Sequence, residues 1–309
     1  MKSKLVSVLV FCMCSLTAFP YAPRINGAKA DLLLILVDNE GCTVSNAQVS
    51  VMFYITPEKV DVKEGWTDER GRFGVCGNTI GEIRAWIRKD GYYDTKLHPN
   101  FRTLTDEDAT KMHAWSKETV KNVVTIKKKQ KPIKLHYAFN CFQPFPATNT
   151  VVKLDLEQMK WCPPYGDGKN DDVHLLLDAK RNPKVWGDFY THLTLTFPNC
   201  VDGFYRCKVD STSDFKYAYN AQPNAQYDKT LKLRFARTPN AVTNRVALAK
   251  DEYLIYRIRT QTNELGQVTS AHYGRINERM SQLIGLSLQS LYNPNENDTN
   301  LEDTQSVAW

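Results

Sequence analysis

Four carboxylates in the second half of the chain could carry out acid–base chemistry. Asp155 and Glu157 are two residues apart, and Asp171 and Asp172 are adjacent. Hydrolysis of a glycosidic bond needs one carboxylic acid to protonate the leaving oxygen and a second carboxylate to act as base or nucleophile. Because the separation that matters is spatial, the sequence leaves open a hydrolase that acts on polysaccharide through these residues.

The other common catalytic patterns are absent from the sequence. No histidine is followed three residues later by a glutamate or a second histidine, a spacing that would suit a compact zinc site. There is no Gly-x-Ser-x-Gly elbow to expose a nucleophilic serine, and no glycine-rich loop ends in Lys-Ser or Lys-Thr to cradle phosphate. We therefore assign no catalytic residue and no metal ligand, expect no cofactor, and interpret the protein as a non-enzyme.

One loop groups oxygen ligands around a glycine, as calcium sites in exported proteins do. Its sequence is Asp167-Gly168-Lys169-Asn170-Asp171-Asp172. The spacing does not match an EF-hand, and Lys169 adds a positive charge in the middle of the loop. We interpret this loop as a solvated turn, with a calcium site as the alternative.

Aromatic residues give the stronger signal for binding. The candidate binding residues are Trp66, Trp86, Tyr92, Tyr93, Trp161 and Tyr165. The first four occupy strand or turn positions that are expected to face outward, and the last two lie close in sequence to Trp186 and Tyr190. Exposed flat rings stack on sugar faces or anchor a protein partner. The alternative is that these rings fill the junction between two domains.

The N-terminus has the pattern of a secretory signal. A basic start at 1–4 is followed by an apolar run at 5–19 and by a small-x-small sequence at 28–30. Cleavage after residue 30 fits the small-residue rule, and cleavage after Ala18 or Ala22 stays open because the gap from the apolar run is long. We expect a secreted, periplasmic or cell-envelope protein with no transmembrane segment after cleavage.

The charge of the chain argues against nucleic acid as a partner. The formal net charge is +6, with 40 basic and 34 acidic residues. Positions 1–30 hold four of the basic residues and no acidic one, so the remaining chain has 36 basic residues and a formal charge of +2. A balance so close to neutral does not predict a nucleic-acid binder.

Six cysteines follow the signal, and an even number in an exported chain predicts disulfides. They are Cys42, Cys76, Cys141, Cys162, Cys200 and Cys207. Fifteen pairings are available. We predict three local pairs, which are Cys42 with Cys76, Cys141 with Cys162, and Cys200 with Cys207. A reduced or metal-bound set is the alternative, although no close pair has the two-residue spacing of a zinc site.

The first third of the chain alternates as β-strands do. Ile83, Ala85 and Ile87 fall on one face of a strand whose other face is mostly charged, and Val49 to Ile55 alternates in the same way. Between them, Asp68 to Gly71 has the residues of a tight turn. One face of each strand is expected to pack on a second sheet, which predicts a β-sandwich.

The order of strands and turns resembles the carboxypeptidase regulatory-like domain. The residues that carry the resemblance are Val37-Asp38-Asn39-Glu40-Gly41, Asn46-Ala47-Gln48-Val49, Thr67-Asp68-Glu69-Arg70-Gly71-Arg72-Phe73 and Lys89-Asp90-Gly91-Tyr92. The match covers about a third of the chain. It implies a transthyretin-like seven-stranded β-sandwich, an accessory module of peptidases, transporters and surface proteins that has no catalytic residues of its own.

The chain departs from that family by an insertion at 101–121. Thr105-Asp106-Glu107-Asp108 has the residues of a helix start, and Ala109, Met112 and Trp115 can form a short apolar stripe. We interpret the insertion as a helical flap over one edge of the sandwich. A solvated loop is the alternative.

The second half is also rich in predicted strands. They lie at 173–177, 192–197, 230–235, 253–262 and 268–276, the last two forming a hairpin around a loop with Gly266, and the polar segment at 295–305 reads as an irregular tail. Several motifs here resemble the second half of a group of uncharacterised secreted bacterial proteins, a resemblance that brings no activity. The motifs are Lys131-Pro132-Ile133, Phe145-Pro146, Leu154-Asp155-Leu156-Glu157, Trp161-Cys162-Pro163-Pro164-Tyr165-Gly166, Tyr292-Asn293-Pro294-Asn295 and Asn300-Leu301-Glu302.

We therefore predict an all-β protein of two domains, with the boundary in the basic run at 129–134. A signal peptide at 1–30 precedes a seven-stranded, transthyretin-like β-sandwich at 31–132, and a second β-sandwich-like, β-rich domain follows at 133–309. The leading hypothesis is a non-catalytic binding protein that recognises a glycan or an envelope protein. The alternatives are the carboxylate hydrolase and a structural subunit whose sheet edges pair with neighbours.

Overall fold

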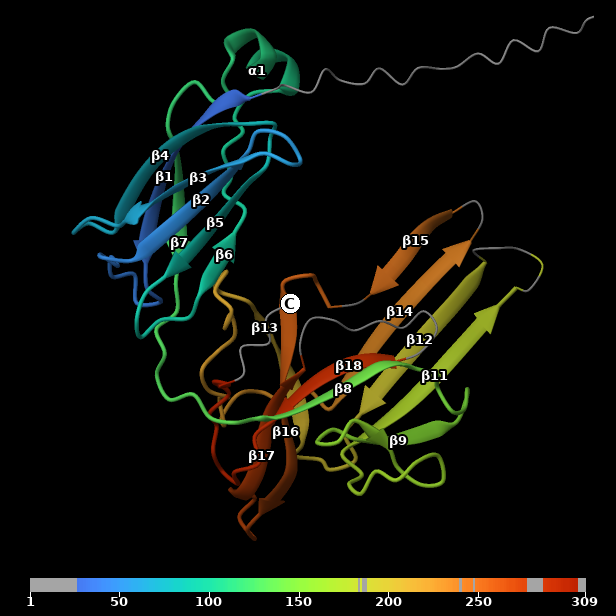
Figure 1. The fold of residues 1–309 in the computed structure, drawn as a ribbon. Coiled ribbons are helices and arrows are strands. Elements are labelled where there is room, and N and C mark those ends of the chain that lie inside the picture. The colour runs from blue at the N-terminus through green and yellow to red at the C-terminus, as the bar shows by residue number, and fades with distance from the viewer. Residues whose placement is uncertain are drawn as a thin grey trace, which may run out of the picture.

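The regular secondary structure of the described residues is almost entirely β-strand, in two groups that follow each other along the sequence (Figure 1). The computed structural model describes residues 27–182, 184, 188–238, 241–246, 248–276 and 286–304. The predicted all-β fold class is confirmed, because one short helix is the sole helix within these ranges.

The first group forms a sandwich of two sheets, called here the N-terminal sandwich. Its elements are β1 (Ala28–Val37), β2 (Gln48–Tyr54), β3 (Val60–Trp66), β4 (Arg72–Thr79), β5 (Ile83–Arg88), β6 (Thr95–Leu97), α1 (Asp106–Met112) and β7 (Val120–Thr125). One sheet has the order β4-β1-β7 and the other β3-β2-β5-β6. The seven strands in two sheets agree with the sandwich predicted from the alternating residues.

The core of the N-terminal sandwich lies between these sheets. Leu34 on β1, Val51 and Phe53 on β2 and Ala85 on β5 have no exposed surface. The turn between β3 and β4 depends on Gly71, which has φ +69° and would place a Cβ 2.7 Å from the backbone oxygen of Leu36. Only glycine fits this position without strain, so the predicted turn is confirmed together with its residue.

The insertion contains the predicted helix. Thr105 is the N-cap of α1, and its hydroxyl accepts a hydrogen bond from the Asp108 backbone N–H. Ala109 and Trp115 are buried, and the Trp115 indole N–H donates to the Thr79 carbonyl at 2.8 Å. Met112, predicted to share this apolar stripe, is exposed instead. No helix in the described ranges is both long and apolar enough to cross a bilayer.

The second group of strands is called here the C-terminal β-region. Its elements are β8 (His136–Gln143), β9 (Val151–Asp155), β10 (Lys160–Trp161), β11 (Val173–Arg181), β12 (Phe189–Thr196), β13 (Gly203–Lys208), β14 (Thr230–Thr238), β15 (Ala241–Val246), β16 (Glu252–Thr262), β17 (Val268–Ile276) and β18 (Leu286–Tyr292). They form two sheets, β10-β9-β11-β12-β14-β15 and β13-β16-β17-β18-β8. A hydrophobic core fills the space between them.

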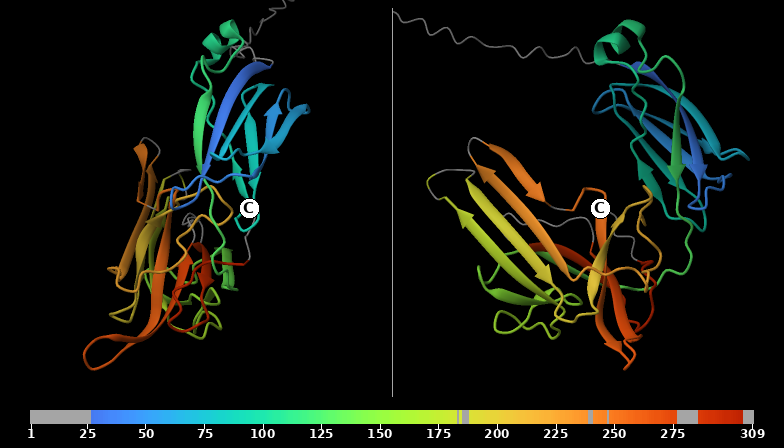
Figure 2. Two further views of the ribbon diagram at one scale, coloured as in Figure 1. Left: turned by 90° about the vertical axis from the view of Figure 1, so that its left-hand side faces the viewer. Right: turned by 180° about the vertical axis from the view of Figure 1, so that it is seen from behind.

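The sheet that contains β16 and β17 is covered on both faces. One face packs on the core just described, and the other carries Tyr253, Ile255 and Tyr273 in a second, aromatic cluster. Tyr93 from the N-terminal sandwich and Leu301 from the C-terminal segment join this cluster. Two further views show the sandwich at one end of the C-terminal β-region (Figure 2). The aromatic cluster forms the junction between them, since it contains Tyr93 from the sandwich and Tyr253 from the C-terminal β-region.

The prediction of local disulfides is wrong. Cys76 lies opposite Asp31 in the pairing of β4 with β1. Cys42 lies beside Asp38, to which its N–H donates, and Asp38 is seven residues beyond Asp31 along the chain. Seven extended residues span about 23 Å, and bridged cysteines need Cα atoms within about 7 Å. The described cysteine side chains, those of Cys42, Cys76, Cys162, Cys200 and Cys207, are all free.

The other two predicted disulfides, Cys200 with Cys207 and Cys141 with Cys162, are not formed either, because Cys162, Cys200 and Cys207 are free. Cys207 lies within the extended strand β13, opposite Tyr253, and Cys200 lies in the turn that precedes this strand. Cys162 is buried and its thiol donates to the Asn170 carbonyl at 3.2 Å. The side chain of Cys141, its predicted partner, lies outside the described part of the structure.

Native alkylation is expected to distinguish exposed from buried thiols. Cys42, Cys76 and Cys200 are exposed and should react with iodoacetamide in the folded protein. Burial, together with the nearby Asp155 and Asp171 carboxylates, raises the pKa of Cys162 to about 11, so this thiol should react only after unfolding. Peptide mapping without reductant measures both, and a peptide pair linked through Cys42 and Cys76 would contradict the structure.

Candidate functional site

The exposed face of the sheet β3-β2-β5-β6 carries two tryptophans and is the candidate functional site. It is called here the outer aromatic face. Its residues are Gln48, Ser50, Met52, Tyr54, Val60, Val62, Glu64, Trp66, Arg84, Trp86, Arg88 and Lys96. These side chains point away from the core because they alternate with the buried residues of β2 and β5.

Strand pairing arranges these side chains in rows across the sheet. In one row Trp66, Gln48 and Arg88 lie side by side on β3, β2 and β5. In the next row Glu64, Ser50 and Trp86 do so, and Lys96 of β6 follows Trp86. The two tryptophans therefore stand on either side of β2, two residues apart along the strand direction.

Strand β3 is unusual because its apolar side chains face outward. Val60 and Val62, on the same face as Trp66, are 37% and 44% exposed. On the inner side, the β3 position opposite Val49 is Gly65, and a Cβ there would lie 2.6 Å from the Phe73 ring. Phe73 of β4 thus covers this part of the core in place of a β3 side chain. The outward apolar residues are left without a structural role in the sandwich.

The tryptophans are accessible and have polar neighbours. Trp66 is 61% exposed and Trp86 39% exposed. On β5, Trp86 stands between Arg84, which pairs with Glu82 at 2.8 Å, and Arg88, which pairs with Asp94 at 3.2 Å. Such a face offers flat rings for stacking, with hydrogen-bonding groups beside each ring and little net charge.

The other predicted binding residues are not part of this face. Tyr93 is 5% exposed and lies in the aromatic cluster at the junction, and Trp161 is 7% exposed and packs in the core of the C-terminal β-region. The expectation that Tyr93 faces outward is therefore wrong, because its ring packs against Phe215 and its hydroxyl donates to Glu302. Tyr92 is half-buried. Tyr165 is exposed, but it belongs to the C-terminal β-region and not to the sheet that carries the two tryptophans. Trp186 lies outside the described residues.

Tyr93 belongs to a hydrogen-bonded junction that is organised by Glu302. The Glu302 carboxylate accepts from the Tyr93 hydroxyl at 2.9 Å, from the Gln130 N–H at 2.8 Å and from the Lys131 N–H at 2.5 Å. Burial, followed by the bond to this carboxylate, raises the pKa of Tyr93 far above its usual value. The basic run at 129–134, where the domain boundary is predicted, is therefore held in place by one buried acid.

Lys127 adds an ion pair to the same junction, in which the lysine is buried and Asp210 is exposed. Its side chain is 1% exposed, its ammonium lies 2.8 Å from Asp210, and it also donates to the Tyr217 carbonyl. The ammonium stands 4.8 Å from the centre of the Tyr219 ring. Burial lowers the pKa of Lys127, against the opposing effect of Asp210. Sequence reasoning missed this role, because the run of lysines around it suggests solvent exposure.

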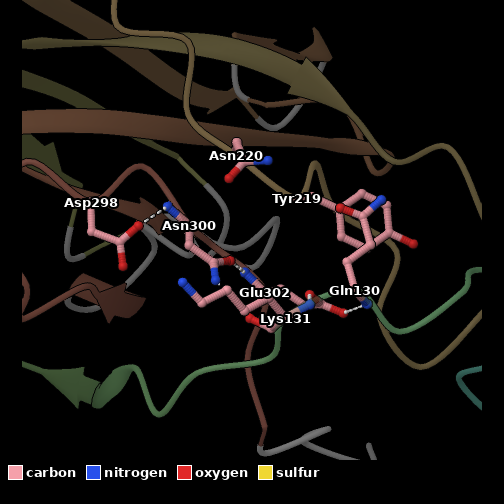
Figure 3. A pocket seen from close by; sticks show the side chains of 7 residues that line it. All are labelled: Gln130, Lys131, Tyr219, Asn220, Asp298, Asn300 and Glu302. Carbon is pink, nitrogen blue, oxygen red and sulfur yellow. Dashed lines mark hydrogen bonds between the residues drawn. The ribbon is translucent and has the colours of Figure 1, made fainter. Parts of the chain in front are cut away.

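A polar pocket of about 280 Å³ runs along this junction (Figure 3). Its lining residues are Gln130, Lys131, Tyr219, Asn220, Asp298, Asn300 and Glu302. Figure 3 shows Glu302 between Gln130 and Lys131, and the Asn300 side chain donates to the Lys131 carbonyl at 2.7 Å. Because these polar groups hold the backbone together, we interpret the pocket as a gap in the junction and not as a ligand site.

The tertiary structure gathers two of the four carboxylates proposed for hydrolysis, Glu157 and Asp172, around one arginine. Arg259 binds both oxygens of Asp172, at 2.9 and 3.0 Å, and its other terminal nitrogen lies 2.8 Å from Glu157. The residue has φ +57° at an irregularity in β16, where Asp202 accepts from the backbone N–H of Arg259 and of Thr260. Asp202 thus positions a strained arginine against the two acids.

The remaining carboxylates also have fixed partners. Asp155 is fully buried and accepts from the backbone N–H groups of Glu157, Gln158, Lys169 and Asn170. Asp171 lies 2.6 Å from the Lys153 ammonium, and Asp167 lies 2.7 Å from that of Lys160. Within the described ranges no three His, Cys, Asp or Glu side chains form a group that could hold a metal ion. The acids organise loops around cations and backbone donors.

Comparison with known proteins assigns this chain to no family. No protein-family model matches the sequence, and no curated protein matches it. Among solved structures it is similar to 3-chlorocatechol 1,2-dioxygenase from Rhodococcus opacus 1CP, with 15% identity over 35% of this chain and 62% of that chain and a TM-score of 0.25. It is also similar to BcpA, the major pilin subunit of Bacillus cereus, with 14% identity over 89% of this chain and 100% of that chain and a TM-score of 0.23.

The chain thus spans about 62% of the dioxygenase's length. At these TM-scores neither likeness carries an argument about function. The resemblance to the carboxypeptidase regulatory-like domain stays a prediction.

Proposed function

We propose that this is an exported, non-catalytic protein that binds a neutral glycan through the outer aromatic face. The observation that carries the proposal is the pair of exposed tryptophans, Trp66 and Trp86, on a sheet face whose apolar edge residues have no role in the core. Indole rings stack on the apolar faces of sugars, and the hydroxyl groups of the sugar then meet polar side chains beside the ring.

The composition of the face favours a glycan over a protein partner. A protein interface has a contiguous apolar centre with a polar rim, whereas here polar Gln48 and Ser50 lie between the two rings. The other apolar side chains lie toward one end of the face, where Val60 and Val62 pair with β2. The arginines beside Trp86 are already paired with Glu82 and Asp94, and Glu64 offsets Lys96 on the same face. This balance of charge supports a neutral ligand.

Pairing of sheet edges with neighbouring subunits is less well supported. Strand β3 is an edge strand, but Asp61 and Lys63 occupy its inward positions and pair with each other at 3.2 Å. Inward-pointing charges on an edge strand oppose the addition of another strand. The hydrolase alternative is weakened by the cations and backbone donors that already occupy the carboxylates of the C-terminal β-region.

Export follows in this proposal from the N-terminal signal pattern. The fold favours a cleavage site before β1. Ala28 and Ala30 are buried in the core at the start of β1, and the Lys29 backbone bonds to His113 and Trp115. Cleavage after residue 30 would remove these contacts, whereas cleavage after Ala18 or Ala22 leaves β1 whole. We therefore propose a mature chain that starts before β1.

A glycan array of residues 23–309 tests the proposed function. We expect binding to neutral glycans that falls by about 30-fold in Trp66→Ala and in Trp86→Ala, since truncating a central aromatic contact costs about 2 kcal/mol. Tyr165→Ala is the matched control, because Tyr165 is an exposed aromatic residue outside the face. A blank array from the folded protein, or a signal that both tryptophan variants retain, would contradict the proposal.

A further inference from the structure

The spacing of the two tryptophans defines the length of the ligand that can reach both. Trp66 lies opposite Gln48, and Trp86 lies opposite Ser50, on the two strands that flank β2. Strands about 4.8 Å apart and residues about 3.4 Å apart place the two Cα atoms about 12 Å from each other. One sugar ring cannot cover both indoles at this distance, so a ligand that uses both must be a chain with an intervening unit.

The position of both tryptophans on one face of the sheet favours an extended chain. In an extended β-1,4-linked chain, successive sugars are turned over relative to each other, so the first and third units present the same ring face to one side. Trp66 and Trp86 stand on the same face of the sheet, and Gln48 and Ser50 lie between them. The first and third sugars can therefore stack on the indoles while the hydroxyl groups of the second meet the polar side chains of β2.

The twist of the sheet favours a single soluble chain over a crystalline surface. Adjacent strands are rotated by about 20–25° relative to each other, so that β3 and β5 differ by about twice that angle. The surface that carries the two indoles is therefore twisted and not flat. A flat crystalline face would touch one indole at a time, whereas a single glycan chain can twist to follow both.

We propose that the outer aromatic face binds one soluble, neutral, β-1,4-linked glycan chain of at least three sugar units, which crosses β3, β2 and β5 obliquely. Trp66 and Trp86 stack on units separated by one sugar. This inference rests on the proposed function and adds the class and minimum length of the ligand.

Calorimetric titration of residues 23–309 with oligosaccharides of defined length tests the inference. The probes are β-1,4-linked oligomers of glucose and of N-acetylglucosamine with one to six units. We expect the affinity for one series to rise at least tenfold between two and four units and then to level off. Trp66→Ala and Trp86→Ala should each reduce the affinity for the four-unit chain to that for the two-unit chain, and Tyr165→Ala should leave both unchanged.

Some results would contradict the inference and leave the proposed function standing. Equal affinity for one and four units, retention on crystalline cellulose or chitin without binding of soluble chains, or no binding of either series would overturn the inference. A positive array that depends on the tryptophans would still support the proposed function in each of these cases. A folded protein that binds no glycan on the array overturns both.

Discussion

Replacing Arg259 with methionine is expected to lower the free energy of unfolding by about 3–5 kcal/mol, which is typical when one partner of a buried ion pair is removed. Asp172 is 1% exposed and has both carboxylate oxygens on the Arg259 guanidinium. Without Arg259 this carboxylate keeps a single backbone donor, the Leu156 N–H at 2.9 Å. Urea denaturation followed by fluorescence measures the loss.

The effect should depend on pH. Burial raises the pKa of Asp172 and Arg259 opposes that rise, so the folded protein holds the aspartate proton more tightly than the unfolded chain does. The contribution of such a group to the free energy of unfolding is full below the pKa of the unfolded chain. It is lost as the pH rises through the raised pKa of the folded protein. Loss of Arg259 raises the pKa further, and the destabilisation is therefore expected to be larger at pH 7 than at pH 4.

Two further variants provide the comparison. Arg206→Met removes an exposed pair with Glu252 at 3.5 Å and should change stability by less than about 1 kcal/mol. Adding Asp172→Asn to Arg259→Met removes the unpaired charge and should restore part of the loss. Equal effects of Arg259→Met and Arg206→Met would show that the Arg259 cluster is not held as described.

Glu302→Gln is expected to loosen the junction between the two groups of strands and to destabilise the protein by about 2–3 kcal/mol. The carboxylate accepts three hydrogen bonds, two of them from the backbone of the linker. An amide group turns one acceptor into a donor, so that at least one buried donor loses its partner.

Trypsin reports on this change directly. The run of lysines at 127–131 is a cleavage sequence, but Lys127 is buried, the Lys128 carbonyl accepts from Tyr219 and the Lys131 N–H is bound to Glu302. We expect cleavage within this run to be roughly tenfold faster or more in the variant, since proteolysis follows the population of the open form. Glu264→Gln, at an exposed hairpin loop, is the matched control. Equal cleavage rates in Glu302→Gln and the unaltered protein would refute this role of Glu302.

The outer aromatic face could be predicted only in part. The alternation of Ile83, Ala85 and Ile87 places Trp86 outward, and the structure agrees. Strand β3 has no such pattern, because Val60 and Val62 face outward and Gly65 faces the core. Whether an apolar residue of an edge strand points in or out depends on what covers it from the opposite sheet. Here that residue is Phe73, which no local pattern connects to Gly65.

The sequence by itself determined the all-β class, the strands around 49–55 and 83–87, the Asp68–Gly71 turn and the N-cap of α1, because these depend on neighbours within a few residues. Tertiary structure alone decided which aromatic rings are exposed, how the acids surround Arg259, how far apart the cysteines lie and how Glu302 holds a linker some 170 positions away. Each of these depends on distances between segments remote in sequence. Strand pairing and packing set such distances, and the spacing of residues along the chain does not contain them.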